Sequence, residues 1–342
     1  MPGLEKLSPR ESGIFIAQNS KDVFIREEAI QEFVSNLYEA LEGGEVLKNE
    51  DHETFLFKKL SEKDSLNYIL FLDAVNFCFW SPPDEPHWTV TYKGVPYSGY
   101  FALTAAVARA FDDGVVLFDP AVYANLTFDQ LDKLLKGDQG VSAPLTKERL
   151  ECLLEVGATL LDKFGGSFEN CVSLAKGNAK ALLEIIIENF PCFDDSCDFL
   201  GKRVSFHKRA QILVGDTWGF YKSQGIAKFD DIDSLTMFAD YRVPQVLVAL
   251  GILEYSEGLM NALKKNQLLK PGCEYEIEIR GCAIRAVDLI VQALRKYMAE
   301  GDRNYHPECN DMAIDYHLWW YRRAHEEKLE SIPFHKVRTI YY

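Results

Sequence analysis

The chain has 342 residues, with 52 acidic against 37 basic side chains and a net charge of −15. This length allows one large domain or two closely packed ones. A strongly acidic protein repels DNA and long RNA unless basic side chains form a patch, whereas a few Lys and Arg suffice to bind one phosphate group. We therefore expect a small-molecule partner and no long nucleic acid.

The sequence has no run of about 18 apolar residues and begins without the apolar segment of a signal peptide. Its eight cysteines form no C-x-x-C pair, and Cys192 and Cys197 have no companion pair at metal-ligand spacing. We expect a soluble protein of the cytoplasm, or of cytoplasm and nucleus, with no membrane segment. We also expect reduced thiols, no metal site and no cofactor.

The first part of the chain is predicted to be helical up to a β-hairpin. Residues 11–48 have apolar side chains at helical spacing. Residues 66–80 are apolar on nearly all sides, which is typical of a buried helix, and Asp73 and Asn76 share one side of it. Because buried polar groups need partners, these two either brace the fold or face a cavity. Residues 87–100 alternate around a Lys-Gly turn and predict the hairpin.

Helical patterns dominate the remainder of the chain. They span residues 99–112, 128–135, 146–164, 170–190, 206–220, 244–255, 274–298 and 313–325. Residues 191–199 are predicted to be a loop with an edge or hinge, and residues 335–341 a short extended segment. The fold class is therefore mainly α with a small β element. We expect a single compact enzyme unit over residues 1–342, or two intimately packed helical lobes at 1–200 and 201–342.

The sequence contains none of the motifs for phosphoryl transfer, dinucleotide binding, serine hydrolysis or zinc hydrolysis. Its most informative stretch is residues 229–245, in which Asp240 lies between an apolar approach and an aromatic-cation pair. Pro244 fits the first turn of a buried helix, so Asp240 faces the positive end of that helix. The simpler interpretation is that Asp240 only caps the helix.

Five segments in combination resemble the queuosine salvage family, the queuosine 5′-phosphate N-glycosylase/hydrolases. They are residues 72–80 (LDAVNFCFW), 208–213 (KRAQIL), 237–245 (MFADYRVPQ), 278–280 (EIR) and 314–319 (IDYHLW). The combination and its order are specific. The resemblance looks close to the mammalian members and extends over essentially all 342 residues.

The resemblance implies an α-helical fold related to the helix-hairpin-helix DNA glycosylases. It also implies release of the base queuine from queuosine 5′-monophosphate, for salvage into tRNA modification, with Asp240 as the catalytic residue. Cleavage of an N-ribosidic bond builds positive charge on the sugar, which a carboxylate either stabilises or attacks. Apolar Met237, Phe238 and Ala239 would exclude water. Because queuine is a 7-deazapurine, it cannot be protonated at N7, so we expect the reaction to depend unusually on Asp240 and on contacts to other edges of the base.

Further site residues follow from the resemblance and from the pattern. His52 matches a recurring His of the family, Asp315 could pair with the secondary amine or the diol of the queuine side chain, and Phe238 could stack on the base. Asn76 is a polar residue in an apolar helix. Trp319 belongs to a dense aromatic segment, for which core packing is the simpler interpretation. Some of four cations should hold the 5′-phosphate: Lys208, Arg242, Arg280 and Arg322.

Two other functions remain open on sequence grounds. The resemblance to helix-hairpin-helix proteins would also fit a glycosylase acting on DNA or tRNA, although the net charge of −15 argues against it. From a different class, the chain would be a non-catalytic binding or carrier protein for a modified base. The sequence also leaves open whether Asp240 acts covalently or electrostatically, whether the unphosphorylated nucleoside is accepted, and the oligomeric state.

Overall fold

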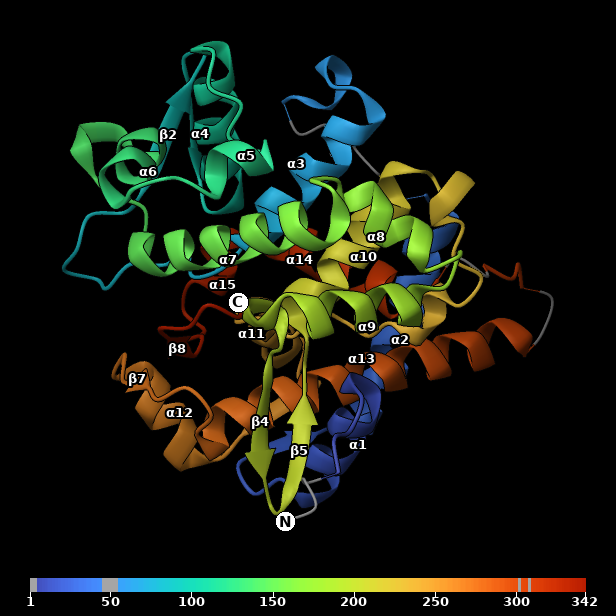
Figure 1. Ribbon diagram of the computed structural model, residues 1–342. Coiled ribbons are helices and arrows are strands. Elements are labelled where there is room, and N and C mark those ends of the chain that lie inside the picture. The colour runs from blue at the N-terminus through green and yellow to red at the C-terminus, as the bar shows by residue number, and fades with distance from the viewer. Residues whose placement is uncertain (1–4, 45–54, 301–302, 307–308) are drawn as a thin grey trace. The chain divides into compact units, whose positions relative to one another are not determined.

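The computed structural model (Figure 1) describes residues 5–44, 55–300, 303–306 and 309–342. Within these ranges the chain forms fifteen α-helices and four two-stranded sheets. The predicted mainly α fold with a small β element is therefore confirmed, whereas its relation to helix-hairpin-helix DNA glycosylases stays a prediction. None of the described helices is both long and apolar enough to span a lipid bilayer.

The chain divides into two compact units, each assembled from segments that are separate in the sequence. Unit 1 contains Met1–Glu50, Asp195–Lys208 and Asp233–Arg338, and unit 2 contains Asp51–Asp194, Arg209–Ile232 and Thr339–Tyr342. The predicted organisation of the chain, one enzyme unit or two lobes at 1–200 and 201–342, stays a prediction.

Unit 1 is organised around α13 (Glu274–Ala299), a helix of 26 residues whose middle turns are buried on most sides. The helices that pack against it include α1 (Pro9–Asn19), α2 (Glu27–Glu42) and α14 (Asp311–Ala324) (Figure 1). The short elements of unit 1 are β1 (Val23–Ile25), β4 (Ser196–Phe199), β5 (Lys202–Ser205), α11 (Val243–Ala249), β6 (Leu253–Tyr255), α12 (Glu257–Lys264), β7 (Leu268–Leu269), α15 (Glu326–Leu329) and β8 (Lys336–Val337). Strand β1 pairs antiparallel with β6, β4 antiparallel with β5, and β7 parallel with β8.

Unit 2 has α3 (Glu62–Ala74) at its centre, and every residue of α3 from Ser65 onward is buried. Two buried arginines hold its C-terminal end. Arg149 donates to the carbonyl oxygens of Val75, Phe77 and Cys78, and Arg209 donates to those of Asp73 and Ala74. The other elements are β2 (Thr89–Tyr92), β3 (Val95–Ser98), α4 (Tyr100–Asp112), α5 (Pro120–Tyr123), α6 (Phe128–Leu135), α7 (Thr146–Phe164), α8 (Phe168–Leu174), α9 (Ala179–Asn189) and α10 (Lys208–Phe220), whose first residue belongs to unit 1.

Several predicted elements are confirmed closely. Helices α6 and α7 begin and end at the predicted residues, and α4 and α13 differ from the prediction by one residue at an end. Strands β2 and β3 form the predicted hairpin, with Lys93 and Gly94 at its turn in left-handed conformations. Local signals are clearest for α6, which begins with a capping box of Thr127 and Gln130, and for the hairpin with its Lys-Gly turn.

Other predicted helices are divided or shorter. The predicted helix at 11–48 is wrong between α1 and α2, because Val23–Ile25 forms strand β1 and pairs with β6. Residues 45–48 of this predicted helix lie outside the described ranges. The predicted helix at 66–80 ends at Ala74, where the buried arginines bind the carbonyl oxygens that follow. Long-range pairing and buried side chains override the local pattern in both cases.

Three further boundaries differ from the prediction. The helix predicted at 170–190 is two helices, because Lys176 and Gly177 have φ values of 51° and 74°. The predicted loop at 191–199 contains β4. The helix predicted at 244–255 ends at Ala249, and the chain then enters β6.

Candidate functional site

Asp240 is held at the start of α11 by one of its two carboxylate oxygens. It is half-buried, and its Oδ1 accepts hydrogen bonds from the backbone N–H groups of Arg242 at 2.8 Å and Val243 at 2.9 Å. Pro244 occupies the first turn of α11, where its missing N–H leaves no bond unmade. Asp240 is not the N-cap residue of α11, which is Arg242, but its Oδ1 binds the N–H groups at the start of the helix, and these two bonds fix the direction of the carboxylate.

The second oxygen of Asp240 is available to a ligand. Among the residues that the structure describes, none donates a hydrogen bond to Oδ2. The three residues that precede Asp240 are apolar and buried, namely Met237, Phe238 and Ala239. A carboxylate with one anchored and one available oxygen is preorganised for a partner.

Asp315, on α14, brings a second carboxyl group to Asp240. Its side chain is buried, and its Oδ1 accepts the backbone N–H of Phe238 at 3.0 Å. Burial raises the pKa of Asp315 well above its ordinary value, and the charge of Asp240 raises it further, whereas the Phe238 N–H and the charge of Lys208 lower it. Two neighbouring carboxyl groups in such different environments can divide ionised and protonated roles between them.

Lys208 reaches this cluster from the junction of β5 and α10. The preceding residue, His207, has a φ of 47°, a left-handed conformation that turns the chain sharply out of the strand. The backbone N–H of Lys208 donates to Oδ2 of Asp195 at 3.2 Å, and its ammonium lies close enough to lower the pKa of Asp315. The structure therefore brings Lys208, Asp240, Phe238 and Asp315 together within unit 1.

Arg280 is buried and bound to protein acceptors, unlike a cation that is free to bind a phosphate. It is 2 % exposed, and its two terminal nitrogens bind the two carboxylate oxygens of Asp195 at 3.0 and 2.5 Å. Its Nε donates to the carbonyl oxygen of Ala239 at 2.9 Å. Every nitrogen of the guanidinium thus has a protein acceptor, which favours a role in holding the site over contact with a phosphate.

Arg242 lies near both Asp240 and a second cation, Arg322. The Arg242 guanidinium lies over the ring of Phe334 at 4.3 Å and donates to Oε1 of Gln245 at 3.4 Å. Burial lowers the pKa of Arg242, and the neighbouring charge of Arg322 lowers it further, whereas the charge of Asp240 raises it. Arg322 itself donates to Glu326 at 2.8 Å. Two cations this close favour an anion between them.

The remaining predicted residues have mixed outcomes. Trp319 meets Trp320 edge-on at 5.0 Å, and Arg323 lies over its ring at 5.2 Å. Asn76 belongs to unit 2, where it is buried and donates to Oδ1 of Asp73 at 3.2 Å. This hydrogen bond supports its interpretation as a residue that braces the fold, and its substrate contact stays a prediction. His52 lies outside the described residues.

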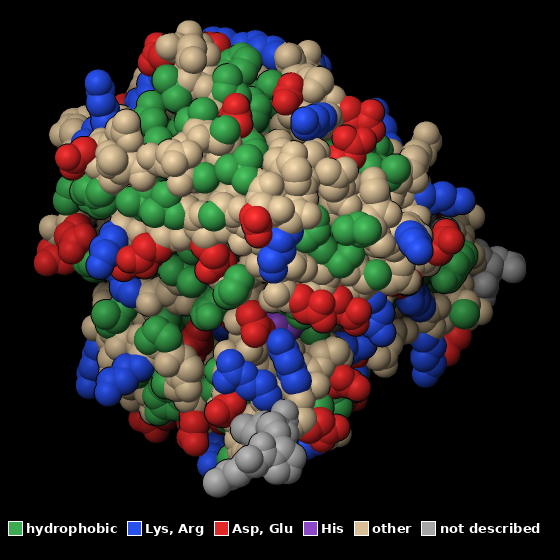
Figure 2. All heavy atoms as spheres, viewed as in Figure 1, with side chains coloured by type: hydrophobic (Ala, Val, Ile, Leu, Met, Phe, Trp, Pro, Cys, Tyr) green, Lys and Arg blue, Asp and Glu red, His purple; other side chains and the backbone are tan. Residues whose placement is uncertain are grey.

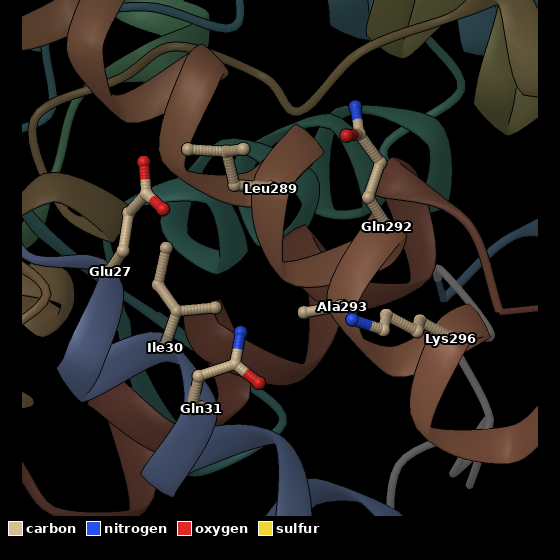
Figure 3. Close-up of a pocket in the computed structure, with 7 residues that line it drawn as sticks. All are labelled: Glu27, Ile30, Gln31, Leu289, Gln292, Ala293 and Lys296. Atoms are coloured by element: carbon tan, nitrogen blue, oxygen red, sulfur yellow. The ribbon is translucent and has the colours of Figure 1, made fainter. Parts of the chain in front are cut away.

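A separate shallow pocket lies between α2 and α13 (Figure 3). Glu27, Ile30 and Gln31 approach it from α2, and Leu289 and Lys296 are among the residues that face them from α13. No predicted site residue lines it. The carboxyl groups of Asp240 and Asp315 therefore remain the better centre for chemistry in unit 1.

Sequence reasoning missed Asp195. It lies in a segment that was predicted to be a loop or hinge, and a single Asp in such a segment carries no signal of a buried role. Its partner Arg280 is 85 positions away, so no local pattern connects the two. A sequence signal existed only for Arg280, as one of the candidate cations.

Comparison with known proteins identifies the family. The family model described as "Queuosine salvage protein" matches residues 56–342. Proteins named "Queuosine 5'-phosphate N-glycosylase/hydrolase" from Bos taurus and Mus musculus are 44 % and 43 % identical, covering 100 % and 98 % of this chain and 100 % and 99 % of their own lengths. A protein of the same name from Sphaerobacter thermophilus is 38 % identical over 81 % of each chain. The chain therefore belongs to the queuosine salvage protein family.

Proposed function

We propose that this protein hydrolyses the N-glycosidic bond of queuosine 5′-monophosphate and releases queuine. The observation that carries the proposal is the state of Asp240: its Oδ1 is anchored by two backbone N–H groups, its Oδ2 is available, and the buried Asp315 is beside it. The names of the relatives support the substrate and the reaction.

In the proposed reaction the bond between C1′ of the ribose and the base nitrogen breaks, and positive charge develops on the sugar. Asp240 faces that charge, either as a fixed anion or as a nucleophile that forms a transient ester. A water molecule then adds its oxygen to C1′. One of its protons stays on the new C1′ hydroxyl, and the other goes to the base nitrogen, directly or through a carboxylate, so that queuine and ribose 5-phosphate result.

The proposed substrate contacts divide by chemistry. Arg242 and Arg322 are the cations best placed to hold the 5′-phosphate, because the charge of Arg322 is close enough to lower the pKa of Arg242 and an anion bound by both would offset their repulsion. Asp315 binds the secondary amine or the diol of the queuine side chain, and Phe238 packs on the base. Lys208 stays in the proposal as a charge beside Asp315. The contacts of His52, Asn76 and Trp319 with substrate remain predictions.

The proposal favours a mononucleotide over a polymer. The net charge is −15, and on the face seen in Figure 2 the Lys and Arg side chains are interspersed with Asp and Glu. Tight binding of DNA or tRNA would need a continuous basic surface to replace the counterions of many phosphates. A strongly salt-dependent affinity for tRNA would contradict this part of the proposal.

The test is release of queuine from queuosine 5′-monophosphate by the purified protein, followed by chromatography and mass spectrometry. Asp240→Asn should lower kcat by at least about 10²- to 10³-fold, because the amide loses the charge that faces the sugar. Asparagine can still accept the two N–H bonds at the start of α11, so the thermal stability should change little.

The matched control is Asp231→Asn. Asp231 also accepts two backbone N–H groups at a helix start, those of Ala179 at 2.6 Å and Lys180 at 3.1 Å, but it belongs to unit 2 and binds the start of α9. It should keep full activity. Full activity of Asp240→Asn would overturn the mechanism, and recovery of intact nucleotide after stoichiometric binding by the wild type would instead identify a carrier.

A further inference from the structure

We infer that Arg280 and Asp195 form a positioning pair that holds Asp240 and Lys208 in their working arrangement. The inference rests on the proposed function, because it concerns the geometry of the reaction assigned to Asp240. It makes neither residue a contact of the substrate. Both residues, and all the groups that they hold, belong to unit 1.

On one side the pair fixes the chain immediately before Asp240. The Arg280 Nε donates to the carbonyl oxygen of Ala239 at 2.9 Å, and the guanidinium lies over the ring of Phe206 at 4.1 Å from its centroid. Asp240 follows Ala239 directly, and its Oδ1 binds the start of α11. The backbone on both sides of Asp240 is therefore tied down, from α13 on one side and from α11 on the other.

On the other side the pair fixes the chain at Lys208. The Asp195 carboxylate accepts the backbone N–H of Lys208 at 3.2 Å, and the Asp195 carbonyl oxygen accepts those of Phe206 at 2.9 Å and His207 at 3.2 Å. Asp195 thus binds three successive N–H groups where β5 turns into α10. This turn includes the left-handed His207, a conformation that persists only where the surroundings impose it.

The segment before Asp240 and the segment at Lys208 are linked by the ion pair of Arg280 and Asp195, whose two hydrogen bonds fix its orientation. The terminal nitrogens of Arg280 bind the two Asp195 oxygens at 3.0 and 2.5 Å, and both side chains are at most 4 % exposed. A buried ion pair contributes little net stability because both charges lose their hydration, whereas a planar two-bond pair restricts the relative orientation of its partners strongly. Orientation of the reacting groups is where such a pair has its largest effect.

The experiment compares Arg280→Met and Asp195→Asn with the wild type on queuosine 5′-monophosphate and on the unphosphorylated nucleoside. Methionine keeps an unbranched apolar side chain of similar reach but binds neither the Ala239 carbonyl nor Asp195. We expect kcat to fall about 10²-fold in each variant, the loss typical of a displaced reacting group, with KM changed less than about threefold. The loss should be equal for nucleotide and nucleoside, because a positioning residue does not contact the phosphate.

Glu278→Gln is the matched control. Glu278 is as buried as Arg280 and lies two positions before it on α13, but its carboxylate binds Ser20, Lys21 and Asp22. This variant should lower thermal stability and leave kcat unchanged. If Arg280→Met does not fold, the isosteric Asp195→Asn tests the positioning role, provided that its circular dichroism spectrum is close to that of the wild type. Arg280→Lys is then the second variant.

The outcomes separate the inference from the function. A wild type that releases no queuine would overturn the proposed function. An active wild type with unchanged kcat in both pair variants would overturn the positioning role alone. A loss confined to KM and to the nucleotide would show instead that Arg280 binds the phosphate, and a kcat loss of the same size in Glu278→Gln would show a general effect of weakening α13.

Discussion

The buried carboxyl group of Asp315 should make the stability of the protein depend on pH. Burial and the nearby Asp240 raise the pKa of Asp315 well above its ordinary value. In the unfolded chain the carboxyl group loses its proton near pH ~3.9, whereas the folded protein retains the proton to a higher pH. Unfolding therefore releases a proton between the two pKa values, and the stability contributed by this group falls as the pH rises through that window.

The prediction concerns Asp315→Asn, which keeps an oxygen for the Phe238 N–H and cannot ionise. The free energy of unfolding of the variant, relative to the wild type, should increase with pH above ~3.9 by up to about 1.4 kcal/mol per pH unit until the folded pKa is reached. Urea unfolding at a series of pH values measures this difference. A constant difference between the two proteins would mean that Asp315 is ionised at the same pH in both states.

At the scale of residues, the sequence identified the charged side chains of the site but not the partners that they bind. Asp240 stood out through its motif, and the structure adds that one of its oxygens binds two N–H groups at the start of α11. Arg280 stood out only as a cation, and its direction depends on Asp195 and on the Ala239 carbonyl, which lie 85 and 41 positions away. Such long-range partners leave no periodicity in the sequence, so the role of Arg280 required the fold.

At the scale of elements, the crossing of α1 and α13 depends on two glycines. A Cβ at Gly281 would lie 2.6 Å from the Cβ of Ile16, and a Cβ at Gly13 would lie 2.7 Å from Cγ2 of Ile284. Both glycines lie within helices, where the sequence alone marks them only as poor helix formers. The amphipathic pattern predicts the existence of the two helices, but the closeness of their crossing follows only from the packed structure.

Gly281→Ala should therefore destabilise the protein. The overpacking cost of about 1–3 kcal/mol exceeds the gain in helix propensity of at most about 1 kcal/mol. The Ile16 Cβ cannot move without its backbone, so α1 and α13 must separate, which also displaces the adjacent Arg280. Thermal unfolding and kcat are the measurements, and both should decrease.

Gly219→Ala provides the comparison for this prediction. Gly219 lies in α10, and a Cβ there would meet nothing within 4 Å. This variant should gain about 0.5–1 kcal/mol from the helix propensity of alanine. An equal gain in Gly281→Ala would show that the α1–α13 crossing has room for a methyl group.

At the scale of the whole chain, each unit combines distant segments. Unit 1 draws Asp195–Lys208 out of the middle of the sequence, and with it the β4–β5 hairpin and one member of the positioning pair. No composition change or linker marks the ends of this segment, so the sequence offered no sign that it leaves its neighbours. Element types could be predicted because they are local, whereas membership of a unit depends on pairing and burial over hundreds of positions.

The buried His335 makes the stability of the chain depend on pH in the acid range. Burial lowers the pKa of His335 to about 3, and the charge of Arg280 contributes to the decrease. The unfolded chain takes up a proton at this side chain near pH ~6.5, whereas the folded protein excludes it. The contribution of His335 to the free energy of unfolding is therefore fully present above pH ~6.5. It is lost as the pH falls toward 3, by up to about 1.4 kcal/mol per pH unit.

His335→Gln removes this titration, so the pH profile of its unfolding free energy should be flatter than that of the wild type between pH ~6.5 and 3. Parallel profiles would contradict the exclusion of the proton from the folded state. Arg280→Met offers an independent check within the same experiment. Because the charge of Arg280 is one of the two causes of the low pKa, its removal should raise the pKa of His335 and end the loss of stability at a higher pH.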